Sequence, residues 1–196
     1  MRDKIILATT SPHRRKAFAS LGYGFVCEGS DVDERFEDRP SSPSDLVRVL
    51  SRLKAEGVAS RHKEGIVIGF DSVGYSRGEV LEKPRSFYEG FERLNFLSGQ
   101  EGTFFTGVCV INAGESSIGD VCDVSRTNFK MNNLDPNEIR DYLLSDPRFD
   151  TYALGFDLLS HFSLTFINEI HGSYNNILHG IPLEMIPGML REVSGR

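Results

Sequence analysis

A short apolar run followed directly by a helix start is the feature that most constrains the fold. Ile5-Ile6-Leu7-Ala8 is apolar and partly β-branched, and residues 4–9 are predicted to form a buried strand. Ser11-Pro12 follows at once; serine is a favoured N-cap and proline suits the first helical position. Gly22 marks the end of this helix. The N-terminal segment is therefore predicted to be a strand–turn–helix unit.

The alternation of strands and helices continues along the chain and then gives way to clustered strands. Apolar spacing and turn residues predict strands over residues 25–27, 66–69, 104–111, 117–129 and 162–167, and helices over residues 44–61, 87–97, 135–143 and 183–193. Strict alternation would indicate a purely parallel sheet, whereas clustered strands indicate antiparallel pairs as well. We therefore predict an α/β fold with a mixed, twisted sheet and flanking helices.

Length and charge limit the domain count and the partners. The 196 residues suffice for one domain, or for one domain with two lobes around a cleft, and residues 1–196 are predicted to form a single domain. The chain carries 22 Lys and Arg against 28 Asp and Glu, a net charge of −6. Sequence-blind binding to nucleic acid needs a positive field, so we expect no nucleic-acid polymer as a partner. A small anionic substrate held by a few local cations is compatible with this charge.

Cysteine usage and the apolar run bear on the compartment. Cys27, Cys109 and Cys122 form no CxxC pair, and they are predicted to pack in the core as thiols. No secretory signal is readable, and the run at residues 5–8 is too short to cross a bilayer. We therefore expect a cytoplasmic protein with no membrane partner.

The turn between the first strand and the first helix is a candidate anion site. Unpaired N–H groups and the helix dipole favour anions at a helix start. Hydroxyls of Thr9 and Ser11 and the guanidinium of Arg14 would complete a phosphate cradle. The same residues also suit an ordinary capped surface helix with solvated basic side chains, and the residues alone leave both interpretations open.

A scattered set of carboxylates and lysines is the second candidate. Asp71 is expected at the end of an apolar strand, where open α/β sheets bind ligands. Glu34 closes an acidic loop, and Lys83 precedes the stiff Pro84. Carboxylate oxygens suit Mg²⁺ bound together with substrate phosphates, although an acid at a strand end is often only a turn residue. No HExxH, GxSxG, Walker or GxGxxG pattern is present, which argues against zinc, triad, P-loop and Rossmann chemistry.

Several short segments occur in an order that resembles one known family. They are LATTSPHR (7–14), DVDE (31–34), LKA (53–55), GFDS (69–72), EKP (82–84), LSG (97–99), TGV (106–108) and a closing stretch through Phe166-Ile167, Gly172, Tyr174-Asn175 and Gly180-Ile181-Pro182-Leu183. The first is like the LAS-x-SPRR opening, the fourth like the GADT motif and the fifth like the GKP motif of the Maf family, the septum-formation-inhibitor-like proteins. The resemblance covers nearly the whole chain.

The resemblance implies both an architecture and a reaction. Maf-like proteins have a mixed-sheet α/β fold with a cleft between two lobes, similar to inosine triphosphatases, and are often homodimers. The implied reaction is hydrolysis of a nucleoside triphosphate to the monophosphate and pyrophosphate with a divalent cation, Mg²⁺ or Mn²⁺. By position, Asp71 is implied as the catalytic base or a metal ligand, and Glu34 as a metal ligand. The implied triphosphate-binding residues are Ser11, Arg14, Lys54 and Lys83.

The chain departs from the family pattern at two places. His13 stands where the family usually has arginine, unless a one-residue insertion makes Arg14 and Arg15 the true pair. Residues 150–160 echo a DKAGAYGIQG motif without its lysine and glutamine. These losses keep a second hypothesis in view, a catalytically weakened nucleotide-binding regulatory protein of the same fold. A third is another phosphate-handling α/β enzyme, such as a nucleotidyltransferase.

Overall fold

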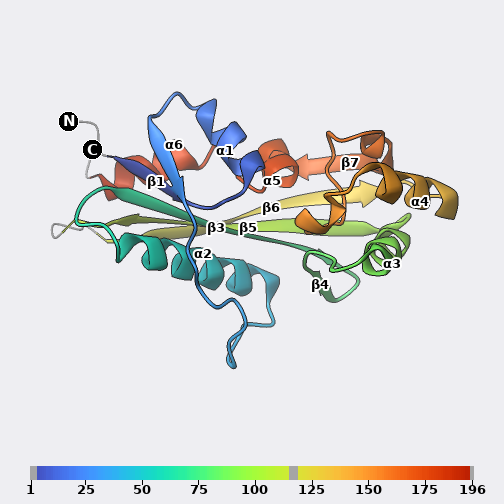
Figure 1. Cartoon of the computed structure of the whole chain (residues 1–196), viewed down its shortest axis with the longest axis horizontal. Coiled ribbons are helices and arrows are strands. Elements are labelled where there is room, and N and C mark those ends of the chain that lie inside the picture. Colours follow the sequence, from blue (N-terminus) through green and yellow to red (C-terminus); the bar gives the residue numbers. More distant parts are fainter. Residues whose placement is uncertain (1–3, 115–118, 195–196) are drawn as a thin grey trace. The chain divides into compact units, whose positions relative to one another are not determined.

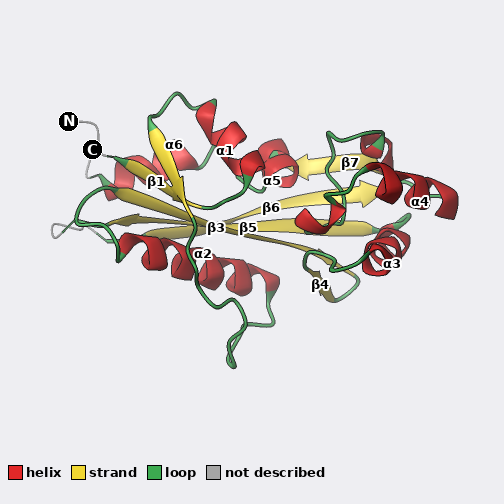
Figure 2. Ribbon diagram, in the orientation of Figure 1, coloured by secondary structure: helices red, strands yellow, loops and turns green. Residues whose placement is uncertain are grey.

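A seven-stranded mixed sheet forms the centre of the computed structural model, which describes residues 4–114 and 119–194. The strands follow the order β2-β1-β3-β5-β6-β7, with β4 paired to β3 (Figure 1, Figure 2). The strands are β1 (Ile5–Ala8), β2 (Phe25–Glu28), β3 (Ile66–Ser76), β4 (Glu79–Leu81), β5 (Glu101–Asn112), β6 (Val121–Met131) and β7 (Ile167–Gly172). The helices are α1 (Pro12–Ala19), α2 (Pro43–Ala59), α3 (Phe87–Leu97), α4 (Pro136–Ser145), α5 (Tyr174–His179) and α6 (Ile186–Val193), with 3₁₀ turns η1 (Phe149–Thr151) and η2 (Ser163–Phe166). The predicted mixed α/β fold is confirmed.

The chain divides into two compact units. The first consists of Met1–Ser72, Thr106–Ser125 and Asn175–Arg196, and the second of Val73–Phe105 and Arg126–Tyr174. The single domain expected over residues 1–196, and its cleft between two lobes, stay predictions. Within the described residues, none of the helices has the length and apolar character needed to cross a membrane.

Alternate side chains of β1 pack against helices on opposite faces of the sheet in the first unit. β1 runs parallel to both β2 and β3, so it is a central strand covered on both faces. Ile5 and Leu7 belong to an apolar cluster with residues of α1 and α6. Ile6 and Ala8 belong to a second cluster with residues of α2. Figure 1 shows α1 and α6 on one face of these strands and α2 on the other. The continuous apolar run at residues 5–8 therefore reflects burial on two sides.

Two glycines let α2 lie unusually close to the sheet. A methyl group added to Gly69 of β3 would lie 2.0 Å from the backbone oxygen of Ser51, and one added to Gly107 of β5 would lie 2.0 Å from the backbone oxygen of Val47. Real Cβ atoms essentially never approach an atom that closely. The backbone of α2 thus rests directly on the two strands, and this contact fixes which residues of α2 face the sheet.

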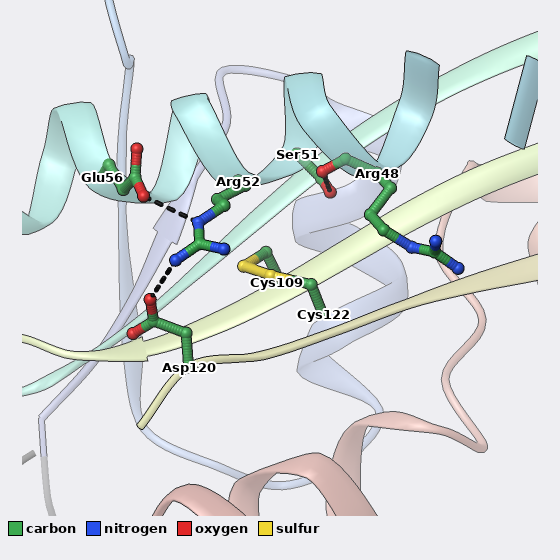
Figure 3. Close-up of a disulfide and its surroundings, with 7 residues drawn as sticks. All are labelled: Arg48, Ser51, Arg52, Glu56, Cys109, Asp120 and Cys122. Carbon is green, nitrogen blue, oxygen red and sulfur yellow. Dashed lines mark hydrogen bonds and ion pairs between the residues drawn. A yellow bond between two sulfur atoms is a disulfide. The ribbon is translucent and has the colours of Figure 1, made fainter. Parts of the chain in front are cut away.

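A disulfide joins two strands beneath α2. Cys109 of β5 and Cys122 of β6 are bonded, and Figure 3 shows the bond on the side of the sheet that α2 covers. Above it, Arg52 Nε lies 2.8 Å from Glu56 Oε1 and Arg52 Nη2 lies 2.9 Å from Asp120 Oδ2. The expected core packing is confirmed for Cys109, which is buried, and Cys122 packs against the same cluster, but the expectation that both are thiols is wrong because they are joined in a disulfide. The expected core packing is wrong for Cys27, which is exposed on β2, the outermost strand.

The second unit contains the largest departure from the predicted secondary structure. The strand predicted over residues 162–167 is absent up to Phe166: Ser163–Phe166 form η2, and β7 begins only at Ile167. Ser163 and Phe166 are the buried positions, and their spacing of three suits a 3₁₀ turn. The ring of Phe166 packs edge-on against Tyr142 of α4, with ring centroids 5.3 Å apart. Packing against α4 therefore determines this segment more than its local β-propensity does.

A buried phenol organises the segment that precedes η2. The Tyr142 hydroxyl donates to Asp146 Oδ2 at 2.8 Å and accepts from the backbone N–H of Asp157 at 3.0 Å. Asp157 in turn accepts at Oδ2 from the hydroxyl of Ser160 at 2.6 Å. Burial raises the pKa of Tyr142 far above its usual range, so the phenol stays neutral and donates. The carboxylate of Asp157 is thus engaged within its own loop.

Gly69→Ala is expected to destabilise the first unit. The added methyl meets backbone atoms of α2, which can move only if the helix moves, so the free energy of unfolding should fall by about 1–3 kcal/mol or more. Gly188→Ala is the control, because an added methyl there meets nothing within 4 Å, and alanine in α6 should stabilise by about 0.5–1 kcal/mol. Urea unfolding curves measure both effects, and equal stability of the two variants would contradict this account of α2 packing.

Candidate active site

The first unit gathers charged side chains where β1 ends and β3 continues. β1 pairs with β3 only as far as Ala8 opposite Gly69, so β3 has no β1 neighbour from Phe70 onward. The start of α1, the middle of α2 and the connection between α5 and α6 all contribute to this open edge of β3. Four residues implied by the sequence meet here, namely Arg14, Glu34, Lys54 and Asp71.

Arg14 of α1 is held in one orientation by three acceptors. Its Nε donates to the backbone oxygen of Gly180 at 2.9 Å, Nη1 to the backbone oxygen of Phe70 at 3.4 Å, and Nη2 to Ser72 Oγ at 2.8 Å. The Phe70 oxygen lies just past the last residue pair between β1 and β3, so Arg14 takes over where β1 stops. The guanidinium also lies over the Phe70 ring, 5.5 Å from its centroid. These contacts use three of its five N–H groups and leave two for a ligand.

Lys54 joins two carboxylates on the face of the sheet covered by α2. Its Nζ lies 2.6 Å from Asp71 Oδ1 and 2.8 Å from Glu34 Oε1. The Lys54 and Asp71 side chains are only 13% and 9% exposed, whereas that of Glu34 is 48% exposed. The ammonium is therefore buried against β3, with Glu34 closing it off on the solvent side.

Burial and charge act against each other at Asp71. Burial raises the pKa of its carboxyl, and Glu34 adds to the rise, while Lys54 and Arg14 oppose it. Burial likewise lowers the pKa of Arg14, and the charges of Asp71 and Glu34 oppose that fall. Successive side chains of a strand point to opposite faces, so the Asp71 and Ser72 side chains lie on opposite faces of β3. Arg14 lies at the edge of β3, where it binds Phe70 and Ser72, the residues on either side of Asp71, so the two charges lie close together at this part of β3.

The acidic loop that carries Glu34 is fastened at its base. Arg61 Nε, just after α2, lies 2.9 Å from Glu28 Oε1, and Arg61 also binds Asp31 and the backbone oxygen of Gly29. His62 Nε2 lies 2.8 Å from Glu28 Oε2, a contact that lowers the pKa of Glu28. The loop therefore leaves β2 at a fixed point beside the end of α2.

The hydroxyls at the start of α1 are used locally. Ser11 is the N-cap, and its side chain accepts from the Arg14 N–H at 3.4 Å. Thr9 Oγ1 accepts from the Ser11 N–H at 3.2 Å, and Thr9 is buried. Both hydroxyl oxygens act here as acceptors, so the helix is capped as expected, and the phosphate-binding role of Thr9 and Ser11 stays a prediction. The surface-helix interpretation is wrong for Arg14, whose guanidinium is not a solvated surface charge but is bound to β3 and Gly180.

Two sequence-based placements differ in the structure. Asp71 does not end its strand: β3 runs on to Ser76, because residues 74–76 pair with β4 in an antiparallel hairpin. Lys83 belongs to the second unit, where it is exposed between β4 and α3. Arg15, the alternative partner of Arg14, lines a separate groove of about 630 Å³ between α1 and β2.

Sequence reasoning missed the residues that hold Arg14. Ser72, Thr106 and Gly180 all lie in segments that resemble family motifs, but no role followed from their residue types. The link between Arg14 and Gly180 spans 166 positions and that between Ser72 and Thr106 spans 34, so local patterns carry no sign of either. The only signal was their position in the GFDS, TGV and GIPL segments.

The carboxylates present fit a divalent cation that is shared with a substrate. Across residues 4–114 and 119–194, no three His, Cys, Asp or Glu side chains converge as a set of protein ligands. Glu34 and Asp71 nevertheless flank one cation already, the Lys54 ammonium. One or two carboxylates are what Mg²⁺ uses when phosphate oxygens and water complete its shell. The donor set therefore suits a cation brought together with a polyphosphate.

Lys54→Met is expected to raise the pKa of Asp71 further. Removing the ammonium removes the main opponent of the burial effect, so the carboxyl should ionise only at higher pH. Carboxyl ¹³C NMR titration measures this, with the Asp71 signal assigned by its loss in Asp71→Asn. Lys63→Met, which removes an exposed lysine, should leave the titration where it is. A lower or unchanged pKa in Lys54→Met would contradict the proposed electrostatics.

Comparison with known proteins gives the family of this chain. A family model described as Maf-like protein matches residues 4–193. A dTTP/UTP pyrophosphatase from Clostridium perfringens is 35% identical over 185 residues, 93% of each chain. A 7-methyl-GTP pyrophosphatase from Pseudomonas syringae pv. tomato is 34% identical over 189 residues, 95% of this chain and 94% of its own. A solved HAM1 protein from Coxiella burnetii overlaps 96% of this chain and 98% of its own, at 14% identity and a TM-score of 0.49. The chain therefore belongs to the Maf-like protein family.

Proposed function

We propose that this chain hydrolyses nucleoside triphosphates to the monophosphate and pyrophosphate with a divalent cation. The observation that carries the proposal is the pairing of a buried ammonium with two carboxylates, Glu34 and Asp71, next to an anchored Arg14. Relatives that match over nearly the whole chain are named as pyrophosphatases of dTTP and UTP or of 7-methyl-GTP, and these names support the same reaction.

The proposed phosphate-binding groups carry full or partial positive charge. Arg14 offers two N–H groups, and the N-terminus of α1, organised by Thr9 and Ser11, adds backbone N–H groups and a favourable dipole. Lys54 contributes its ammonium once a ligand competes for it. Lys83, from the second unit, is proposed as a further phosphate ligand by its place in the EKP segment.

Asp71 is proposed as the general base. Its pKa lies above the usual aspartate value because it is buried, which makes it a better proton acceptor than a solvated carboxylate. It would take a proton from water as the water oxygen bonds to phosphorus and the bond between the α and β phosphates breaks. Pyrophosphate then leaves with that bonding pair. Mg²⁺ or Mn²⁺, held by Glu34 and Asp71, would neutralise charge on the phosphates.

A second candidate is a regulatory protein that binds nucleotides with little turnover. The observation in its favour lies at residues 150–160, which lack the lysine and glutamine of the family motif. Asp157, the polar residue nearest to replace them, is engaged with Ser160 and the N–H of Leu159 instead. Tight nucleotide binding without pyrophosphate release would favour this candidate, and rapid turnover would exclude it. Transfer of the nucleotide to an acceptor other than water would indicate a nucleotidyltransferase.

The assembly and the compartment are part of the proposal. A homodimer is proposed from the family resemblance, and sedimentation of the purified chain would test it. The cytoplasm is proposed because nucleoside triphosphates are made and consumed there. That compartment keeps most thiols reduced, so Cys109 and Cys122 would be a close thiol pair in the cell unless an oxidant joins them.

A screen of standard and modified nucleoside triphosphates, with pyrophosphate detection and added Mg²⁺ or Mn²⁺, tests the activity. It should include dTTP, UTP and 7-methyl-GTP, and at least one substrate should give monophosphate and pyrophosphate rather than diphosphate and phosphate. Asp71→Asn should lower kcat by on the order of 10²- to 10⁴-fold, because asparagine cannot accept the proton. Asp141→Asn, on the exposed face of α4, should match the wild type. No turnover with any nucleotide and metal would overturn the proposal.

Glu34→Gln is expected to weaken the use of the metal. Losing one of two charged ligands should raise the Mg²⁺ concentration for half-maximal activity about tenfold, with a smaller change in the rate at saturating metal. Glu37→Gln, an exposed carboxylate in the same loop, is the matched control and should leave the metal dependence unchanged. If both variants shift the metal curve equally, a general loss of negative charge would explain the result, and Glu34 would not be a ligand.

A further inference from the structure

The hydroxyls of Ser72 and Thr106 form a chain that ends on Arg14. Ser72 Oγ lies 2.8 Å from Arg14 Nη2 and 2.7 Å from Thr106 Oγ1. All three residues belong to the first unit, Ser72 on β3 and Thr106 on the neighbouring β5. Gly180 packs against the Ser72 hydroxyl, since a methyl group added to Gly180 would lie 3.0 Å from Ser72 Oγ. The Ser72 hydroxyl is therefore enclosed by named neighbours on most sides.

Burial fixes the direction of the hydrogen bond between the two hydroxyls. Thr106 is fully buried, and within the described part of the chain its hydroxyl meets no acceptor other than Ser72 Oγ. If Ser72 donated to Thr106, the Thr106 proton would be buried without a partner, which proteins avoid. Thr106 must therefore donate to Ser72.

This direction determines what Ser72 can still do. A serine oxygen accepts through two lone pairs. The Arg14 N–H takes one and the Thr106 O–H takes the other, so the oxygen is saturated as an acceptor. Its own O–H has no acceptor among the described residues, and Ser72 is partly exposed. Two incoming donors also polarise the hydroxyl and make it a stronger donor.

We propose that Ser72 donates a hydrogen bond to a phosphate oxygen of the ligand, and that buried Thr106 is the positioning residue that commits Ser72 to donation. The two N–H groups left on Arg14 Nη1 and Nη2 lie beside this hydroxyl, so a single anion can receive both kinds of donor. This inference rests on the proposed function for the identity of the ligand, a polyphosphate. It adds Ser72 as a residue that contacts the ligand, and Thr106 of β5 as a buried residue that positions Ser72 without touching the ligand.

A double-mutant cycle with tripolyphosphate as the probe tests the inference. Calorimetric dissociation constants would be measured for the wild type, Ser72→Ala, Thr106→Val and the double variant. Ser72→Ala should weaken binding about tenfold, because a hydrogen bond to a charged oxygen is lost. Thr106→Val should weaken binding roughly threefold to fivefold, because the Ser72 hydroxyl would be less polarised and its O–H would no longer be held in one direction. The double variant should bind like Ser72→Ala alone, because Thr106 acts only through Ser72.

Controls separate this role from a structural one. Thr106→Ser keeps the hydroxyl and should restore most of the affinity lost in Thr106→Val. Thr103→Val alters a threonine on the same strand, in the second unit, and should bind like the wild type. Thermal unfolding checks that each variant folds, and Thr106→Ala replaces Thr106→Val in the cycle if the latter does not.

The possible outcomes are distinct from those of the activity screen. Additive losses in the double variant would overturn the inference, because Thr106 would then act independently of Ser72. Unchanged binding in Ser72→Ala, or no binding by the wild type, would also overturn it. Tripolyphosphate binding with the expected cycle but no hydrolysis of any nucleotide would uphold the inference and refute the proposed pyrophosphatase.

Discussion

Direct contact between the backbone of α2 and the sheet is the constraint on which the rest of the first unit depends. Glycines on β3 and β5 remove the side chains that would hold the helix away, and the helix settles against two strands at once. Lys54 lies about one turn beyond Ser51, the residue whose backbone oxygen faces Gly69. Gly69 in turn lies two positions before Asp71 on β3. Packing of the helix backbone on the sheet, and not the flexible lysine side chain alone, thus brings Lys54 Nζ to 2.6 Å from Asp71 Oδ1.

The charges at this site are stable only as a group. A buried carboxylate or guanidinium is costly in isolation, and its removal from water is repaid only by partners and hydrogen bonds. Asp71 is supported by Lys54 and Arg14, Lys54 by two carboxylates, and Arg14 by two backbone oxygens and a hydroxyl. A polyphosphate with its cation would supply charges of both signs to the same group. These side chains could therefore exchange their bonds to one another for bonds to a ligand, so that binding would need no large rearrangement of the protein.

The sequence predicted local features well and long-range ones poorly. The strand, cap and helix at residues 5–19 follow from adjacent residues, and α3 has the bounds that were predicted. The candidate role of Lys54 came from family resemblance alone, whereas Glu34 was also indicated by its acidic loop, and nothing near either residue in the sequence signals the ion pair between them. The strand bearing Asp71 was predicted too short, since the hairpin with β4 extends it. Residues 162–166 were misassigned because Tyr142, 20 or more positions earlier, packs against them and fixes their turn.

The bond between Arg14 and Gly180 joins the first helix to the connection between α5 and α6, 166 positions later in the sequence. During synthesis, the Arg14 guanidinium has no Gly180 oxygen to bind until 166 further residues have been added. The apolar cluster beneath α1 also depends on this late stretch, because Ile181, Leu183 and residues of α6 pack in the same cluster as Ile5 and Phe18. Packing of the first unit and orientation of Arg14 are therefore completed by the same stretch of chain, and loss of α6 would remove part of the core as well as disturb the Arg14 anchor.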